Sequence, residues 1–91
     1  MSYKILQSDK YLKRAAKFFK KHPDLLDKYA KTIKQLEIDP FYPSLRLHKF
    51  KGDLSEYYSV SIDMSYRIIL DLIITDKEII LLDIGSHDEV Y

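Results

Sequence analysis

The sequence predicts an α+β fold in which two N-terminal helices pack on one face of a small, twisted, mainly antiparallel sheet, in the order β-α-α-β-β-β-β. Three observations predict this class. Apolar residues recur at helical spacing between residues 9 and 39, they recur at every second position between residues 45 and 74, and prolines follow both helical segments. With 91 residues, the chain is expected to form one domain spanning 1–91.

The first helix is predicted to start after an N-cap at Ser8 or Asp9 and to end near His22, because Pro23 excludes its predecessor from helical backbone angles. Lysines and an arginine cover its other faces. The residues expected to form its buried stripe are Leu12, Ala15, Ala16 and Phe19.

A second helix is predicted to open at Pro23 and Asp24 and to end around Asp39, before Pro40. Residues 40–44 form a connector. The apolar stripe of this helix is expected to consist of Leu25, Leu26, Tyr29, Ala30, Ile33 and Leu36.

Five segments are expected to form strands. The first is short, at residues 3–7, and a second short strand is expected at 45–48, where Leu45 and Leu47 alternate with Arg46 and His48. Strands at 57–63 and 66–74 have one apolar face each. The last strand, 79–84, is apolar on both faces and is therefore expected inside the sheet rather than at its edge.

Charge is unevenly distributed along the chain. Residues 1–51 contain 13 lysines and arginines against 5 acidic residues, whereas residues 52–91 contain 2 against 9. A basic half can meet a polyanion, although it can equally be a solvated helix surface. The chain has no cysteine and no apolar run long enough for a signal peptide or a membrane span, so we expect a protein of the cytoplasm without membrane contact.

Common ligand motifs are missing from the sequence. It has no P-loop, no dinucleotide fingerprint and only two glycines, and its three histidines are dispersed along the chain. We therefore expect no cofactor and no metal site.

The candidate chemistry lies in a few polar residues near strand ends. Arg67 is predicted to share a face with Ser59, Ser61 and Asp63, where it either pairs with Asp63 or Asp71 or grips a phosphate. His87 follows the last strand as a candidate proton donor, unless it is an inert loop residue.

The remaining candidates are basic and aromatic. His48, flanked by Arg46, Lys49 and Lys51, is either a base or phosphate contact or part of a solvated edge strand. Aromatic rings that could stack on bases, or simply pack, are those of Tyr57, Tyr58, Tyr66 and Tyr91. Together these groups would supply a base, a phosphate-binding cation, an acid and stacking surfaces for cleavage of RNA without a metal.

The sequence resembles the RelE/ParE superfamily of bacterial type II toxins, and particularly its RelE, YoeB and YafQ branch. The resemblance covers nearly the whole chain and depends on the Lys51-Gly52 turn before Tyr57 and Tyr58, the strand opening at 66–68, and the ending at 85–91. It implies a microbial-RNase-type fold and an mRNA interferase that enters the ribosomal A site and cleaves mRNA there by attack of the 2′-hydroxyl. It also implies a cognate antitoxin as partner.

By this resemblance, Arg67 would stabilise the phosphate, His87 would be the general acid, and Tyr91 would orient the scissile nucleotides. His48 is the expected general base. Residues expected to contact RNA are Arg46, Lys49, Lys51, Tyr57 and Tyr66 near the site, and Lys13 and Lys17 on the basic first helix against ribosomal RNA.

The sequence departs from the YafQ branch at Ser61 and Ser65, where that branch carries a histidine and an aspartate, and a tyrosine at 57 or 58 replaces a common tryptophan. An incomplete histidine set favours a second hypothesis, in which the chain is a non-catalytic binding protein, such as a ParE-like gyrase inhibitor or an inactivated toxin. The oligomeric state of the free chain is not predicted.

Overall fold

The computed structural model describes residues 2–49 and 57–86 of the chain. Its elements follow the predicted order, with two short 3-10 turns added. They are β1 (Lys4–Gln7), α1 (Asp9–Lys21), η1 (Pro23–Leu25), α2 (Leu26–Ile38), η2 (Pro43–Leu45), β2 (His48–Lys49), β3 (Tyr58–Ser61), β4 (Tyr66–Ile73) and β5 (Glu78–Ser86). The α+β class is confirmed.

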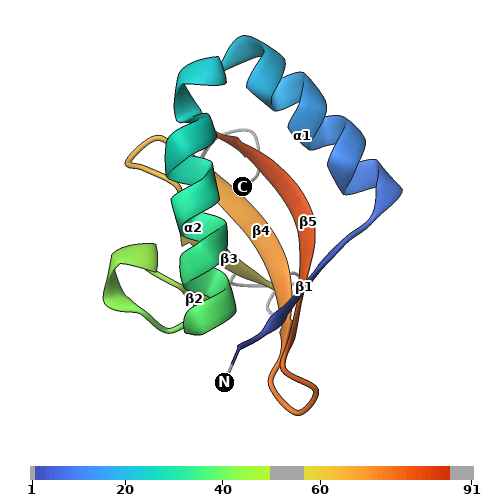
Figure 1. Ribbon diagram of the computed structural model, residues 1–91, viewed down its shortest axis with the longest axis vertical. Coiled ribbons are helices and arrows are strands. Elements are labelled where there is room, and N and C mark those ends of the chain that lie inside the picture. Colours follow the sequence, from blue (N-terminus) through green and yellow to red (C-terminus); the bar gives the residue numbers. More distant parts are fainter. Residues whose placement is uncertain (1, 50–56, 87–91) are drawn as a thin grey trace.

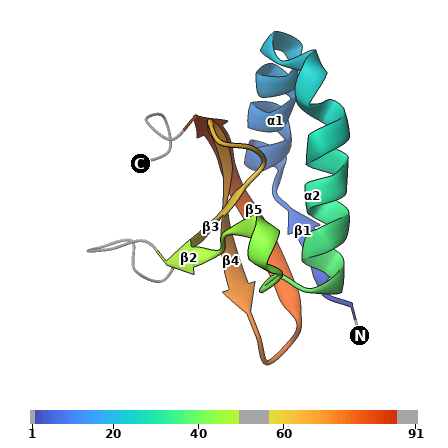
Figure 2. The same cartoon turned by 90° about the vertical axis from the view of Figure 1, so that its left-hand side faces the viewer.

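The strands form one five-stranded sheet in the order β1-β5-β4-β3-β2. β1 pairs with β5 in parallel, and every other pair is antiparallel, so the sheet is mainly antiparallel as predicted. The last strand, β5, lies inside the sheet between β1 and β4. Both helices cover the same face of the sheet, and no helix of the described residues lies on the opposite face (Figures 1 and 2).

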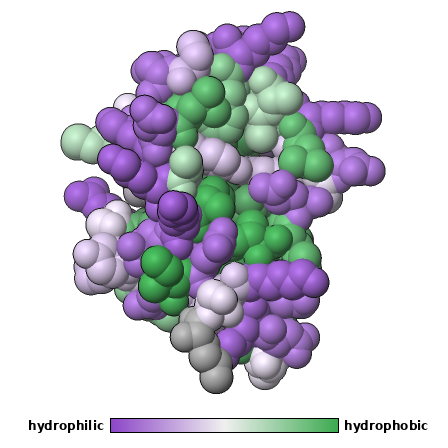
Figure 3. All heavy atoms as spheres, in the orientation of Figure 1, coloured by the Kyte–Doolittle hydropathy of each residue, from purple (hydrophilic) through white to green (hydrophobic). Residues whose placement is uncertain are grey.

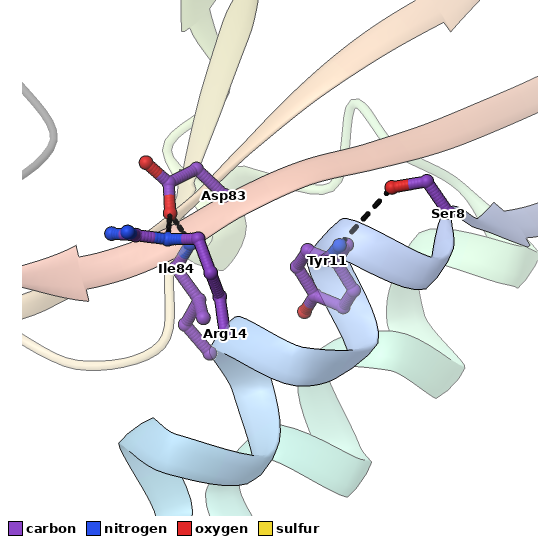
Figure 4. Close-up of polar contacts among 5 residues, drawn as sticks. All are labelled: Ser8, Tyr11, Arg14, Asp83 and Ile84. Atoms are coloured by element: carbon purple, nitrogen blue, oxygen red, sulfur yellow. Dashed lines mark hydrogen bonds and ion pairs between the residues drawn. The ribbon is translucent and has the colours of Figure 1, made fainter.

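The ion pair between Arg14 and Asp83 joins α1 to β5 beyond the point where β1 ends (Figure 4). β1 pairs with β5 only as far as Leu81, and Asp83 lies two residues later. The same carboxylate oxygen of Asp83 accepts a hydrogen bond from the Ile84 N–H at 2.8 Å. Asp83 therefore satisfies a main-chain donor on a stretch of β5 that β1 does not reach.

The buried stripe of α1 differs from the prediction. Leu12 is 46% exposed and Ala16 is also exposed, whereas Tyr11 and Phe18 are buried together with Ala15. Tyr11 can replace an apolar residue in the core because its hydroxyl is 2.8 Å from that of Tyr29 on α2. Burial raises the pKa of Tyr11 far above its ordinary value, and the bond to Tyr29 adds to this shift.

In the apolar stripe predicted for the second helix, Leu26 and Ala30 are wrong because they are exposed, whereas the other four residues pack in or against the core: Leu25, Tyr29, Ile33 and Leu36. Leu25 lies in η1, just before α2 begins. Thr32 was not predicted in the core but is buried there. Its hydroxyl donates to the Lys28 carbonyl at 2.8 Å, which removes the cost of burying a polar group.

The strand predicted at residues 45–48 is shorter than expected. Residues up to Leu45 form the turn η2, and Arg46 has the left-handed backbone angles φ 52° and ψ 47°, which are incompatible with a strand. Pairing begins only at His48. Leu45, predicted on a strand, is instead buried against the core from the turn.

Hydrophilic side chains project around the outline of the helix-covered face, with hydrophobic atoms between them in the middle (Figure 3). Neither helix in the described part of the chain is long and apolar enough to cross a bilayer.

Candidate functional site

The face of the sheet opposite the helices, which we call the open face, carries His48 of β2, Ser59 and Ser61 of β3, and Arg67 of β4. Alternation along the strands separates the two faces. Val60, Ile68 and Leu70 belong to the core cluster on the helix-covered side, so the residues between them point to the open face.

Arg67 lies in a row that crosses three strands on the open face. Its neighbours are Ser61 on β3 and Gly85 on β5. The Nη1 group of Arg67 donates a hydrogen bond of 3.0 Å to the Ser61 hydroxyl. Gly85, the neighbour on β5, carries no side chain and is itself buried.

Of the two alternatives for Arg67, the ion pair with Asp63 or Asp71 is not formed in residues 2–49 and 57–86, where Arg14 and Asp83 form an ion pair. The Asp63 carboxylate instead accepts bonds from the main-chain N–H groups of Ser65 and Tyr66 in the turn between β3 and β4.

The Nε group of Arg67 is buried and has no hydrogen-bond partner. Leaving such a donor unsatisfied costs about 1–3 kcal/mol. Because no carboxylate of the described residues neutralises this side chain, the guanidinium is a cation held in place by a neutral hydroxyl. Such a group is suited to an anionic ligand.

His48 lies in the next row of the open face, opposite Ser59 of β3. The Ser59 hydroxyl oxygen is 3.1 Å from Nε2 of His48, and Nδ1 of the same ring is 3.2 Å from the Arg46 carbonyl oxygen. His48 is exposed, whereas Ser59 is completely buried beneath it.

The two rows are linked by β3, because Ser59 and Ser61 point to the same face of one strand. Residues two apart in a strand are separated by about 7 Å. Ser59 contacts His48 and Ser61 contacts Arg67, so the imidazole and the guanidinium are held above neighbouring positions of β3.

Other predicted contact residues lie elsewhere. The ammonium group of Lys49 is 5.8 Å from the ring centre of Tyr58, which packs against the core. Lys49 therefore does not lie on the open face. Tyr66 was predicted to contact RNA near Arg67, but its ring packs edge-on against Phe18 of α1 at 5.3 Å. Alternation in β4 places Tyr66 and Arg67 on opposite faces, so the structure does not bring these two together.

Arg46 is exposed and lines a hollow of about 160 Å³ together with Ser61 and Asp63, which places it beside the site. Tyr57 is half-buried just before β3, two residues ahead of Ser59. Lys13 and Lys17 are exposed on α1, in the layer on the far side of the sheet from Arg67 (Figure 2). Lys51, His87 and Tyr91 lie outside the described residues.

The sequence predicted only that Ser59 lies on the polar face of its strand. Its contact with His48 was not predicted. The available signal was a pair of small hydroxyl residues alternating with Tyr58, Val60 and Ile62. Within residues 2–49 and 57–86, histidine, aspartate and glutamate side chains form no group of three that could hold a metal ion.

In comparisons with known proteins, no protein-family model and no curated protein sequence matches the chain. Solved structures do match. YafQ from Escherichia coli is 16% identical, with a TM-score of 0.78 over 98% of each chain. The E. coli DinJ–YafQ toxin–antitoxin complex gives 18% identity and a TM-score of 0.78 over 100% of this chain and 99% of the other.

A YoeB/ParE toxin from Agrobacterium tumefaciens is 16% identical, with a TM-score of 0.71 over 92% of this chain and 98% of the other. At these identities the similarity establishes the fold. The chain therefore has the α+β fold of these toxins over nearly its whole length, as the resemblance to the RelE/ParE superfamily predicted.

Proposed function

We propose that the chain is the toxin of a type II toxin–antitoxin system and that it cleaves mRNA on the ribosome without a metal ion. The observation that carries this proposal is Arg67, a guanidinium with no acidic partner among the described residues, held by Ser61 on the open face beside His48. The fold of YafQ and of the YoeB/ParE toxin supports the assignment to this class.

In the proposed reaction, His48 takes the proton of the 2′-hydroxyl next to the scissile phosphate. The 2′-oxygen then attacks phosphorus, and charge develops on the phosphoryl oxygens. Arg67 stabilises that charge through its guanidinium, which the Ser61 contact already orients. We assign His87 as the acid that protonates the leaving 5′-oxygen and Tyr91 as the aromatic residue that orients the nucleotides.

Binding of RNA is assigned to basic and aromatic residues around this centre. Arg46 lies beside the site, Tyr57 precedes Ser59, and Lys51 belongs to the segment before β3. Lys49 lies near Tyr58 and would have to turn away from that ring to contact RNA at this centre. Lys13 and Lys17 on α1 would contact ribosomal RNA, which is a separate surface on the helix-covered side. Tyr66 is partly buried and would contact RNA only with the exposed part of its side chain.

The test is expression of the chain alone in bacterial cells, followed by mapping of mRNA 5′ ends. We expect growth arrest and new 5′ ends in phase with codons. Arg67→Lys keeps the positive charge but removes the planar fork, so cleavage should fall strongly, about 10²-fold or more by analogy with the loss of one transition-state donor. Growth that continues normally, with no new ends, would contradict the proposal.

The partner is proposed to be a cognate antitoxin, as in the DinJ–YafQ complex. Its acidic or amphipathic segment would cover the basic half of this chain. Co-expression with the product of the adjacent reading frame should restore growth and yield a stable complex. A failure of both would argue against this partner.

The alternative, a ParE-like gyrase inhibitor, is favoured by the absence of the histidine expected at Ser61. A supercoiling assay with purified gyrase separates the two functions. Inhibition of supercoiling without mRNA cleavage would favour the binding protein.

A further inference from the structure

We propose that a basic groove between α2 and the edge of β3, which we call the α2–β3 groove, binds the RNA strand where it continues from the scissile phosphate. The choice of RNA as the ligand rests on the proposed function. The groove consists of two neighbouring hollows of about 370 Å³ and about 160 Å³. Lys28, Lys31 and Gln35 of α2 line the larger hollow, together with Ser44 and Ile62.

The groove exists because β2 covers only part of the edge of β3. The two strands pair at Tyr58 and Ser59, and in the described part of the chain no strand lies beside β3 beyond Ser59 on that side. The chain reaches β2 through η2, which lies beside α2 in Figure 1. Because Arg46 adopts left-handed backbone angles, pairing with β3 begins only at His48, and the edge of β3 next to α2 stays uncovered.

The groove reaches the proposed catalytic centre. Its two hollows share Ser44, Ser61 and Ile62, so they are continuous with each other. The hydroxyl of Ser61 also accepts the 3.0 Å hydrogen bond from Nη1 of Arg67. One end of the groove therefore lies at the residue that holds the phosphate-binding guanidinium, and a strand bound at Arg67 can continue along the protein surface into the groove.

The lining of the groove carries an excess of positive charge. Lys28, Lys31 and Arg46 are exposed, and none of them forms an ion pair within residues 2–49 and 57–86. Asp63 lines the smaller hollow, but its carboxylate accepts two main-chain hydrogen bonds in the turn after β3. Three cations against one engaged carboxylate attract a polyanion.

The side chains of α2 are spaced to follow a strand. Lys28 and Lys31 are three residues apart and Gln35 follows four residues later, so all three lie on one side of the helix. The two ammonium groups can therefore bind one phosphate or two successive ones, and the amide of Gln35 can donate to or accept from a base. Lys34 is also exposed on α2 but does not line either hollow.

The remaining lining residues favour RNA over an acidic peptide. Leu45 and Ile62 are buried and give the groove an apolar side, on which the face of a base can rest. An acidic peptide would also suit the lysines. The groove, however, is continuous with the position of Arg67, and in the proposed function the ligand that occupies that position is RNA.

The first experiment measures binding of a single-stranded RNA of about 12 nucleotides to the full chain by fluorescence anisotropy at several salt concentrations. To allow expression, every protein carries Arg67→Lys, which keeps the positive charge. Lys28→Ala with Lys31→Ala should weaken binding roughly 10-fold and lower the slope of log Kd against log salt concentration by about 1.4, because each phosphate contact with a single strand contributes about 0.7.

Lys34→Ala is the matched control for Lys31→Ala. Both variants remove one exposed lysine from α2, so they differ only in position. Lys31→Ala should lower the salt slope by about 0.7, and Lys34→Ala should leave it unchanged. Equal affinity and equal slope for the parent and the double variant would overturn the inference, and so would equal losses for the two single variants.

The second experiment locates the RNA. The chain has no cysteine, so Lys31→Cys provides one attachment point for a short photo-crosslinker, and Lys34→Cys provides the control. Crosslinks to the RNA should form from position 31 and not from position 34. Crosslinks that form equally from both positions, or from neither, would show that the strand does not follow the groove.

Cleavage is measured separately on ribosomes, in an otherwise native chain. Lys28→Ala with Lys31→Ala should raise KM about 10-fold with little change in kcat, because the groove binds the strand away from the reacting atoms. An unchanged KM would overturn the inference and leave the proposed function standing.

The opposite result separates the two proposals. RNA bound and crosslinked in the groove of a chain that cuts no mRNA would support the RNA site and contradict the proposed function. If the double variant bound RNA normally but lost its complex with the protein from the adjacent reading frame, the groove would belong to a protein partner and the inference would be wrong.

Discussion

Replacement of Arg67 by methionine should stabilise the fold while abolishing cleavage. The buried Nε of Arg67 has no hydrogen-bond partner, at a cost of about 1–3 kcal/mol. Because the side chain is only half-buried, the lower part of that range applies. Methionine has a similar length and carries no donor that would need a partner.

The loss that opposes this gain is the hydrogen bond from Nη1 to Ser61, and such bonds contribute about 0.5–1.5 kcal/mol. The half-buried Ser61 hydroxyl can bond to water afterwards, which limits the loss. We therefore expect a net gain of up to about 1 kcal/mol in the free energy of unfolding. For a domain of this size that corresponds to a rise in Tm of roughly 4–8 °C.

The assay is thermal unfolding followed by circular dichroism, with Arg14→Met as the control. Like Arg67, Arg14 contacts a residue of a neighbouring element. Its partner Asp83, however, is a carboxylate that neutralises its charge, and the pair is largely exposed. The control should lower the free energy of unfolding by up to about 1 kcal/mol. If Arg67→Met lowered Tm as much as Arg14→Met does, Arg67 would be a structural residue and its unsatisfied Nε would not indicate a ligand.

Two further predictions concern α1. Tyr11→Phe removes the hydroxyl bonded to Tyr29 and should cost about 1 kcal/mol at neutral pH. Burial raises the pKa of both tyrosines above the ordinary 10.0, so their contribution is complete below pH 10 and is lost at higher pH. Urea unfolding at pH 7 and pH 10.5 should show a smaller alkaline loss for the variant than for the native chain; an equal loss would contradict this. The double variant Lys13→Glu, Lys17→Glu should bind ribosomes more weakly than the native chain in sedimentation at low salt. The control Lys34→Glu on α2 should have less effect. Equal binding by the native chain, the double variant and the control would contradict a role for this surface.

Helical periodicity identified α1 and correctly placed Ala15 and Phe19 toward the core, but Leu12 and Ala16 are exposed. Leu12 and Tyr11 are neighbours, and hydrophobicity alone favours Leu12 for the core. The structure buries Tyr11 because Tyr29 on α2 supplies a partner for its hydroxyl. That partner is 18 residues away in the sequence, so the choice depends on how the two helices pack and could not be made from α1 alone.

The open face was predicted better than the contacts on it. Alternation in β3 and β4 correctly placed Arg67 with Ser59 and Ser61, because a strand fixes which side chains share a face. It could not show that β2 starts only at His48, since that depends on the left-handed turn at Arg46. The assignments of His87 and Tyr91 lie outside the described residues and stay predictions.

The two faces of the sheet separate stability from chemistry. Val60 and Ile68 point to the helices and are completely buried, so truncation of either would leave a cavity and cost several kcal/mol, about 1–5 by analogy with other cores. Ser61 and Arg67, their sequence neighbours, point the other way and are held mainly by each other. Changes at the site therefore need not disturb the core. The group beside Arg67 is a neutral hydroxyl, which orients the guanidinium without neutralising its charge.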